Sequence, residues 1–131
     1  MCSTWGLDNT RDQNLSGVTV RIVNGTGVTN DSLIVSSVSG GACGGTFRFG
    51  AIDLGSPNYV LTDVNFASSS IQWNHNGQLT VNLGGTPSGT VTPVASSVTA
   101  TYTPDPLMSD PAGNTPMGTA SDTPDSDHYH F

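Results

Sequence analysis

Oxygen-bearing side chains gather in one acidic loop near the end of the chain, and their types are those that suit a metal ion. Asp105, Asp110 and Asn114 fall in this loop, and carboxylate and amide oxygens are the ligands that calcium prefers. The spacing matches no EF-hand, and aspartates in turns usually accept hydrogen bonds from the nearby backbone. We therefore predict no cofactor, with calcium at this loop as the alternative that the sequence leaves open.

Groups that commonly carry catalysis are scarce. The chain has no glutamate and no lysine, and His75 falls in a predicted hairpin turn. Ser88 lies in a Gly-Thr-Pro-Ser-Gly run without the strand–nucleophile–helix context that activates a serine. We predict that the chain is not an enzyme.

The chain has two cysteines, Cys2 and Cys43. A disulfide between them would close a loop of about 40 residues and, in the chain-entropy model, would stabilise the fold by about 3–4 kcal/mol. In an extracellular protein such a bond is about as expected as not, and in a cytosolic protein it is unexpected. The pairing of Cys2 with Cys43 therefore stays open at the level of sequence.

Aromatic side chains suggest a second kind of binding. Tyr59 and Trp73 could form a flat platform on which a sugar stacks, as in carbohydrate-binding modules, although a core position is the commoner fate of a tryptophan on a strand. Trp5 differs because it lies in a polar stretch with no obvious local partner. We predict that Trp5 docks onto another surface.

Composition excludes several classes of partner. The formal net charge is −7, with three arginines and ten aspartates, whereas nucleic acids and anionic membranes are bound by clustered Arg and Lys. No run of 18 apolar residues exists, so no membrane insertion is predicted. The first residues lack the basic and apolar regions of a signal peptide. Whether Met1 is native or replaces a leader stays open.

The same composition predicts an all-β fold. Sixteen glycines accompany abundant Thr, Val, Ser and Asn, which favour short strands and tight turns. Seven or eight short strands at this spacing are typical of an immunoglobulin-like β-sandwich, with a jelly roll or small barrel as the alternative. The strand-forming segments are predicted at 18–23, 32–38, 46–54, 59–66, 69–83 (a hairpin), 90–94 and 98–103.

The hairpin at 69–83 has a register that can be predicted from residue faces. A three-residue loop, 75–77, with Gly77 at positive φ sets Trp73 opposite Leu79 and Ile71 opposite Val81, and it sets Ser69 opposite Leu83. A two-residue loop would mix apolar and polar faces, which a half-buried sheet does not tolerate. We therefore predict the three-residue loop.

Two stretches resemble the closing half of bacterial immunoglobulin-like repeats, which occur in large cell-surface proteins and in phage virion proteins. They are QLTVNL at 78–83 and VTATYTPDPLMSDPAGNT at 98–115. The resemblance implies a spacer, adhesive unit or decoration at an extracellular, cell-surface or virion-surface location. The chain departs from the pattern after Asn114, where a run with Pro116 replaces the expected closing strand.

The chain therefore divides into a polar N-terminal arm (1–16), a β-sandwich domain (17–114) and an acidic C-terminal tail (115–131). We expect a non-enzymatic structural or binding module on a bacterial surface layer or filament, or on a phage capsid or tail; the alternative is a carbohydrate-binding module. A missing closing strand leaves a sheet edge that invites strand addition by a protein partner or a second copy. The large apolar residues predicted to bind that partner are Trp5, Leu7, Met117, Tyr129 and Phe131.

Overall fold

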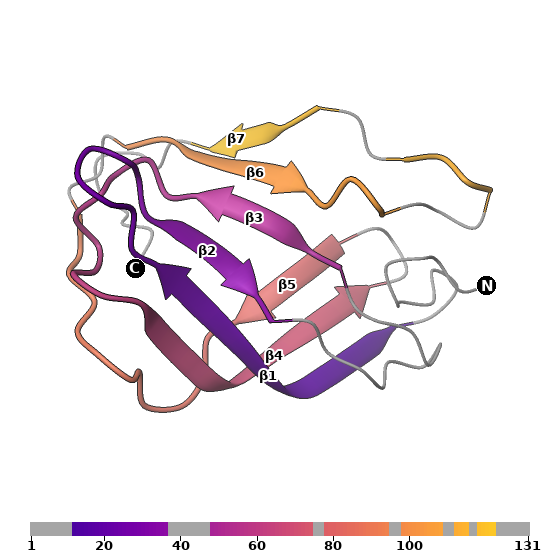
Figure 1. Cartoon of the computed structure of the whole chain (residues 1–131). Helices are drawn as coiled ribbons and strands as arrows, with labels where there is room; N and C mark the ends of the chain where they lie inside the picture. Colours follow the sequence, from indigo (N-terminus) through magenta and orange to yellow (C-terminus); the bar gives the residue numbers. More distant parts are fainter. Residues whose placement is uncertain are drawn as a thin grey trace.

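The computed structural model of the chain is an all-β fold (Figure 1). It describes residues 12–36, 48–74, 78–94, 98–108, 112–115 and 118–122. Within these ranges there is no helix, and hence no helical segment able to cross a membrane. The strands are β1 (Gln13–Val23), β2 (Ser32–Val35), β3 (Gly50–Asp53), β4 (Val64–Asn74), β5 (Gln78–Asn82), β6 (Ala100–Pro104) and β7 (Ala120–Asp122).

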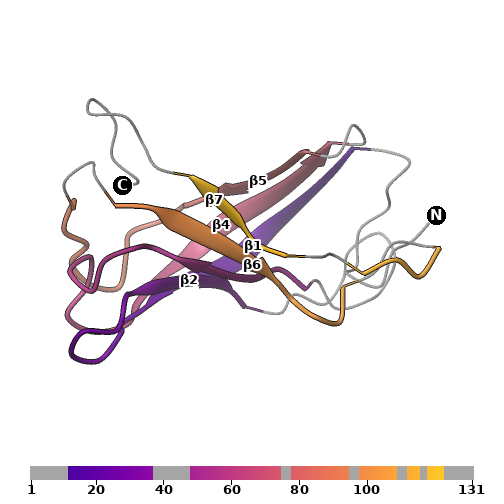
Figure 2. The same ribbon diagram turned by 90° about the horizontal axis from the view of Figure 1, so that it is seen from above.

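All seven strands belong to one sheet, in the order β5-β4-β1-β2-β3-β6-β7, and every neighbouring pair is antiparallel. The prediction of an all-β fold is confirmed, but the strands form one continuous sheet rather than two separately paired layers. The sheet curls into a half-barrel. In Figure 1, β4 and β5 lie behind β2 and β3, and β6 and β7 are uppermost; Figure 2 looks down on β6 and β7 from above.

One face of each strand points into the curl, as alternating sequences predict. Along β1, Val18, Val20 and Ile22 are buried while the residues between them are half-exposed. Ile22 pairs with Leu33 of β2 and with Val64 of β4, so these apolar residues share the inner face. The buried core comprises Val18, Val20, Ile22, Leu33, Phe49, Leu54, Tyr59, Val60, Val64 and Ile71.

A bulge in β1 contributes to the curl. Ser16 pairs with Ser70 and Val18 pairs with Ser69, so Gly17 has no opposite residue on β4. Gly17 has a φ of 68°, a conformation that suits glycine. An extra residue in one strand bends that strand and increases its twist. The bulge therefore helps to turn the long β1–β4 pair around the core.

A buried carboxylate ties together the loops at one end of the half-barrel. The side chain of Asp31 is fully buried and accepts hydrogen bonds from the backbone N–H groups of Gly25 (2.9 Å), Tyr59 (2.9 Å) and Val60 (3.0 Å). These bonds hold Tyr59 and Val60 in the core without a strand. The loops thus close this end of the core.

Two strand predictions need correction. Residues 59–63 were predicted to begin a strand, but they form the loop held by Asp31, and β4 starts at Val64 and runs unbroken to Asn74. Residues 90–94 form no strand; Thr92 donates a single backbone hydrogen bond to Tyr59. The order of the predicted elements otherwise holds. At residues 59–63 the cause lies in the tertiary structure. The buried Asp31 carboxylate accepts the backbone hydrogen bonds of Tyr59 and Val60, which a neighbouring strand would otherwise accept.

Both predicted arms contain strand residues. β1 begins at Gln13, inside the segment predicted as the arm 1–16. β7 (Ala120–Asp122) lies inside the predicted tail and pairs with β6 at Tyr102 and Ala100. A short edge strand therefore follows the loop that carries Asn114, and its three residues are exposed.

The predicted hairpin register is confirmed at two of its three pairs, and the ladder ends at Ser70 and Asn82, before Ser69 and Leu83. Trp73 pairs with Leu79 and Ile71 with Val81, and Asn74 pairs with Gln78, which leaves a three-residue loop. Residues 75–77, including Gly77, lie outside the described residues. A bend at Gly50 was also predicted, and Gly50 has a φ of 98° at the start of β3.

Candidate docking groove

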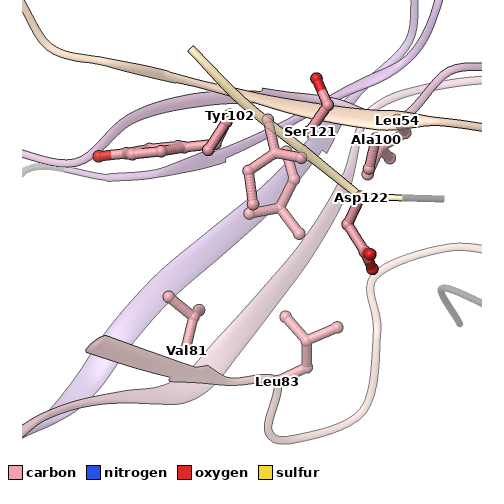
Figure 3. Close-up of a pocket in the computed structure, with 10 residues that line it drawn as sticks. Leu54, Val81, Leu83, Ala100, Tyr102, Ser121 and Asp122 are labelled. Atoms are coloured by element: carbon pink, nitrogen blue, oxygen red, sulfur yellow. The ribbon is translucent and has the colours of Figure 1, made fainter. Parts of the chain in front are cut away.

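The inner face of the half-barrel is not filled along its whole length. Between β5 on one side and β6 and β7 on the other lies a cavity of about 490 Å³. Val81 and Leu83 point into it from the β5 side, facing Tyr102 and Ala100 (Figure 3). Its floor consists of Leu33, Ile52 and Leu54.

A second cavity, of about 610 Å³, continues from the first toward the other end of the sheet. Ile52, Val81 and Tyr102 line both cavities. The two therefore form one continuous depression, which we call the β5–β7 groove. The second cavity is further lined by Phe49, Trp73, Leu79 and Met108.

Strand register explains why these side chains converge. Ile52 pairs with Leu33 on one side and with Tyr102 on the other, and Tyr102 pairs with Ala120. Paired residues of neighbouring strands point to the same face of a sheet. The inner face of β2, β3 and β6 is thus apolar, and on β7 it carries Ala120 and the carboxylate of Asp122. At the opposite edge of the sheet, Leu79 and Val81 of β5 pair with Trp73 and Ile71 of β4 and share their face.

Tyr102 is a fixed part of the groove wall. Its hydroxyl donates a hydrogen bond to the backbone carbonyl of Phe49 and lies 3.7 Å from the sulfur of Met108. Its ring packs against that of Phe49 with centroids 5.1 Å apart. Burial, and then the nearby charge of Asp105, raise the pKa of Tyr102 above its usual value, so the phenol stays neutral and its ring presents a stable apolar surface.

The turn after β6 positions the end of the groove. Asp105 accepts a 2.7 Å hydrogen bond from the backbone N–H of Leu107 and lies 3.7 Å from the guanidinium of Arg48. The backbone N–H of Met108 donates to the Asp105 carbonyl. This compact turn brings the Met108 side chain beside Tyr102.

Both walls of the groove are edges of the sheet. Among the described residues, β5 pairs only with β4, and β7 pairs only with β6. An edge strand offers backbone N–H and C=O groups to a further strand. An apolar floor between two such edges can bind an extended peptide through side chains and backbone together.

The groove carries little that could do bond chemistry. Its apolar residues outnumber its one ionisable carboxylate, Asp122, which is exposed at the rim. In the part of the chain that the structure describes, no group of three or more His, Cys, Asp or Glu side chains is arranged to hold a metal ion. The arrangement is suited to binding.

The predicted calcium ligands are only partly within view. Asp105 is engaged by Arg48 and by its own turn, and Asn114 is exposed in the segment 112–115. Asp110 lies outside the described residues. The structure therefore gives Asp105 a role in the turn next to the groove.

The predicted partner-binding and disulfide residues lie outside the described residues. These are Trp5, Leu7, Met117, Tyr129 and Phe131, together with Cys2 and Cys43. Of the aromatic residues considered for sugar stacking, Tyr59 is buried in the core, whereas Trp73 lines the groove.

The groove itself is not visible in the sequence, although its parts are. Alternating apolar residues in 78–83 and 98–103 predicted two half-buried strands, yet nothing in a single sequence says that these strands lie across a gap from each other. Their approach depends on the curl of the four strands that lie between them in the sheet. A single sequence holds no signal for the groove, because it gives neither the order of the strands in the sheet nor their curl.

The chain matches no protein-family model, no curated protein and no solved structure. Its function is therefore inferred from its own residues and their arrangement.

Proposed function

We propose that this chain is a non-enzymatic structural and binding module that joins a larger assembly through its terminal arms. The observation that carries the proposal is the β5–β7 groove, which combines an apolar floor with two strand edges. Such a surface suits an extended segment of a protein partner. The arms contain the large apolar side chains of Trp5, Leu7, Tyr129 and Phe131.

The location that we propose is based on the sequence. Residues 78–83 and 98–115 resemble immunoglobulin-like repeats of bacterial surface and phage virion proteins, which act as spacers, adhesive units or decorations. A net charge of −7 keeps such a module soluble and disfavours non-specific association. We therefore place it at a cell or virion surface, with protein partners or further copies of itself.

The test compares the full chain with two truncations that spare every described strand. One lacks residues 1–11, since β1 begins at Gln13, and the other lacks residues 123–131, since β7 ends at Asp122. Light scattering after gel filtration gives the mass of each protein, and circular dichroism gives its fold. We expect the full chain to self-associate and at least one truncated chain to be a folded monomer.

A matched pair of variants separates apolar docking from mere arm length. Trp5→Ala with Leu7→Ala removes the large side chains of odd positions, whereas Thr4→Ala with Asp8→Ala changes the even positions of the same arm. The first pair should weaken association and the second should leave it unchanged. Truncated chains that associate like the full chain would refute the proposal. A full chain that is monomeric at every concentration would exclude further copies of itself as the partner.

Carbohydrate binding is the alternative function, and it rests on Trp73 in the groove. Because Tyr59 is buried, a sugar would have to contact Trp73 and Tyr102 inside the groove. Titration of neutral oligosaccharides followed by tryptophan fluorescence tests this. A saturable change that Trp73→Phe abolishes would favour sugar binding over peptide binding.

A further inference from the structure

We propose that residues 128–131 of the same chain occupy the β5–β7 groove as a strand that follows β7, and that an incoming arm must displace them. The inference rests on the proposed function, because it makes the C-terminal tail a competitor for the surface that an arm binds. Four features lead to it: the exposed inner face of β7, the direction of the two edge strands, the length of the connection, and the register that β7 imposes.

The inner face of β7 stays exposed although it faces the groove. Ala120 and Asp122 line the cavity and are both exposed, and Leu83 on the opposite wall is 37% exposed. In Figure 3 the Asp122 side chain points toward the side of Leu83, whereas the Ser121 hydroxyl points away from it. A strand beside β7 would therefore enter the groove with the side chains that lie opposite Ala120 and Asp122.

Strand direction suits the segment that follows β7. Neighbouring strands are antiparallel at all six junctions, so with seven strands the two edges β5 and β7 run the same way (Figure 1). A strand between them that is antiparallel to both must run opposite to β7. A chain that leaves β7 through a tight turn has this direction, because a hairpin joins antiparallel neighbours.

Connection length favours this segment over other occupants. The tail follows β7 directly, and a hairpin needs a loop of only roughly two to five residues. The N-terminal arm enters the sheet at Gln13, which pairs with Trp73 of β4 rather than with an edge strand, so it would have to cross the ends of β4 and β5. A segment from a second copy would compete against an effective concentration of roughly millimolar, which is typical of a short linker.

The register places the two large side chains of the tail in the groove. A hairpin with residues 124–127 as its loop sets Phe131 opposite Ala120 and Tyr129 opposite Asp122. Residues that lie opposite each other on neighbouring strands point to the same face of the sheet. Both aromatic rings would therefore face the groove.

Residues 124–127 suit that loop. Pro124 fits the second position of a type I turn, around which four-residue hairpin loops are most often built. A loop of two residues would set Asp127 opposite Asp122, and like charges directly opposite each other destabilise a sheet. A loop of three residues would turn both aromatic rings outward. The four-residue loop also leaves the aspartates of the tail in water, outside the groove.

The groove has room for the rings. Ala120 pairs with Tyr102, and Tyr102 pairs with Ile52, so a residue opposite Ala120 extends this inner row toward Val81. Phe131 would take that position, where the small side chain of Ala120 leaves space. The cavity has a volume of about 490 Å³, which exceeds that of two aromatic side chains.

The tail would hold the groove loosely. A hairpin of short strands is marginally stable by itself in water, whereas an arm of seven residues such as 1–7 can pair along more of both edges. The tail therefore acts as a resting occupant that covers the apolar floor in the free chain and yields to an arm. The strength of assembly then depends on the tail as well as on the arm.

Disulfide trapping tests the register in the full chain. With Cys2→Ser and Cys43→Ser as background, Ser121→Cys and His130→Cys place thiols at an outward-facing pair that the register sets directly opposite. Such residues have Cα atoms roughly 4.5–5.5 Å apart, a separation that a disulfide spans. The matched control, Ser121→Cys with His128→Cys, keeps the same face but is two residues out of register.

We expect the first pair to oxidise within one molecule at least tenfold faster than the control. Thiol titration gives the rates, non-reducing gel electrophoresis separates bonds within a molecule from bonds between molecules, and circular dichroism confirms the fold of each variant. Equal rates for the two pairs would overturn the inference. A disulfide that forms between molecules instead would assign the tail to a second copy and would also overturn it.

Competition tests the role of the tail. Calorimetry gives the Kd of a peptide of residues 1–11 for two chains, one lacking residues 1–11 and one lacking both 1–11 and 123–131. The second chain keeps β7, which ends at Asp122. Removal of the tail should lower the Kd at least tenfold.

Two pairs of substitutions in the first chain separate the aromatic rings from the length of the tail. Tyr129→Ala with Phe131→Ala should lower the Kd as truncation does, whereas His128→Ala with His130→Ala, at the outward-facing positions, should leave it unchanged. An equal Kd with and without the tail would refute the inference, and the proposed function would survive. If the peptide binds neither chain while the disulfide between positions 121 and 130 forms, the proposed function fails and the placement of the tail stands.

Discussion

Asp31→Ala should be among the most damaging single substitutions in this protein. The Asp31 carboxylate is fully buried and accepts three backbone hydrogen bonds, from Gly25, Tyr59 and Val60. Alanine leaves all three N–H groups without that acceptor. A buried donor left unsatisfied costs about 1–3 kcal/mol, and partial access of water lowers the total below the simple sum. We expect a loss of roughly 3–5 kcal/mol in the free energy of unfolding.

Asp31→Asn sharpens the prediction. Its amide oxygen can still accept from Tyr59 and Val60, which both bond to the same carboxylate oxygen, but its NH₂ group then meets the N–H of Gly25. The loss should therefore be smaller than for alanine, about 1–3 kcal/mol. The matched control is Asp63→Ala, which removes one exposed hydrogen bond to Asn24 and should cost less than about 1 kcal/mol.

Urea unfolding followed by circular dichroism measures these differences. With a typical slope of roughly 1–3 kcal/mol per molar urea, Asp31→Ala should lower the midpoint by roughly 1.5–4 M or leave the chain unfolded in buffer. If Asp31→Ala and Asp63→Ala shift the midpoint equally, the loops are not held by Asp31 and this description of the closed end is wrong.

Two further outcomes follow from the structure. Gly50→Ala should lower the free energy of unfolding by at least about 2 kcal/mol, because φ is +98° and the new Cβ would lie 2.2 Å from the Thr103 carbonyl oxygen. The control, Gly17→Ala, has φ +68° and nothing within 4 Å of its Cβ, so it should cost only about 1–2 kcal/mol. Equal urea midpoints for the two variants would contradict the close approach of β3 and β6. Burial, and then the charge of Asp31, raise the pKa of the Tyr59 hydroxyl above 10.0. The neutral hydroxyl therefore contributes in full to the free energy of unfolding below about pH 10, and this contribution is lost as the pH rises through the folded-state pKa. Tyr59→Phe should flatten this alkaline loss in urea midpoints measured from pH 8 to 11, and an unchanged slope would show that Tyr59 does not titrate as described.

The sequence predicts the strands whose pattern is local and misses the features that depend on distant partners. The pairing of Trp73 with Leu79 follows from faces and loop length within one hairpin. The loop at 59–63 looks like a strand by composition, and only Asp31, 28 residues before Tyr59, explains why it is not one. Alternation cannot reveal such a tertiary acceptor.

The candidate site was also predictable only in part from the sequence. The arms could be singled out from sequence because large apolar residues stand alone in polar segments. The groove could not, because it depends on the curl that brings Val81 near Tyr102, and that curl arises from twist and from the bulge at Gly17. The predicted sandwich is not confirmed for the same reason, since strand patterns do not distinguish one curled sheet from two packed sheets.

The most direct test of the proposed function, the binding of an arm in the β5–β7 groove, is hydrogen exchange on the chain lacking residues 1–11, with and without a synthetic peptide of residues 1–11. We predict that the peptide slows exchange of backbone amides in β5 and β7, the two edge strands, and that a peptide with Trp5→Ala and Leu7→Ala does not. Unchanged exchange at both edges under saturating peptide, or protection confined to other strands, would contradict the account.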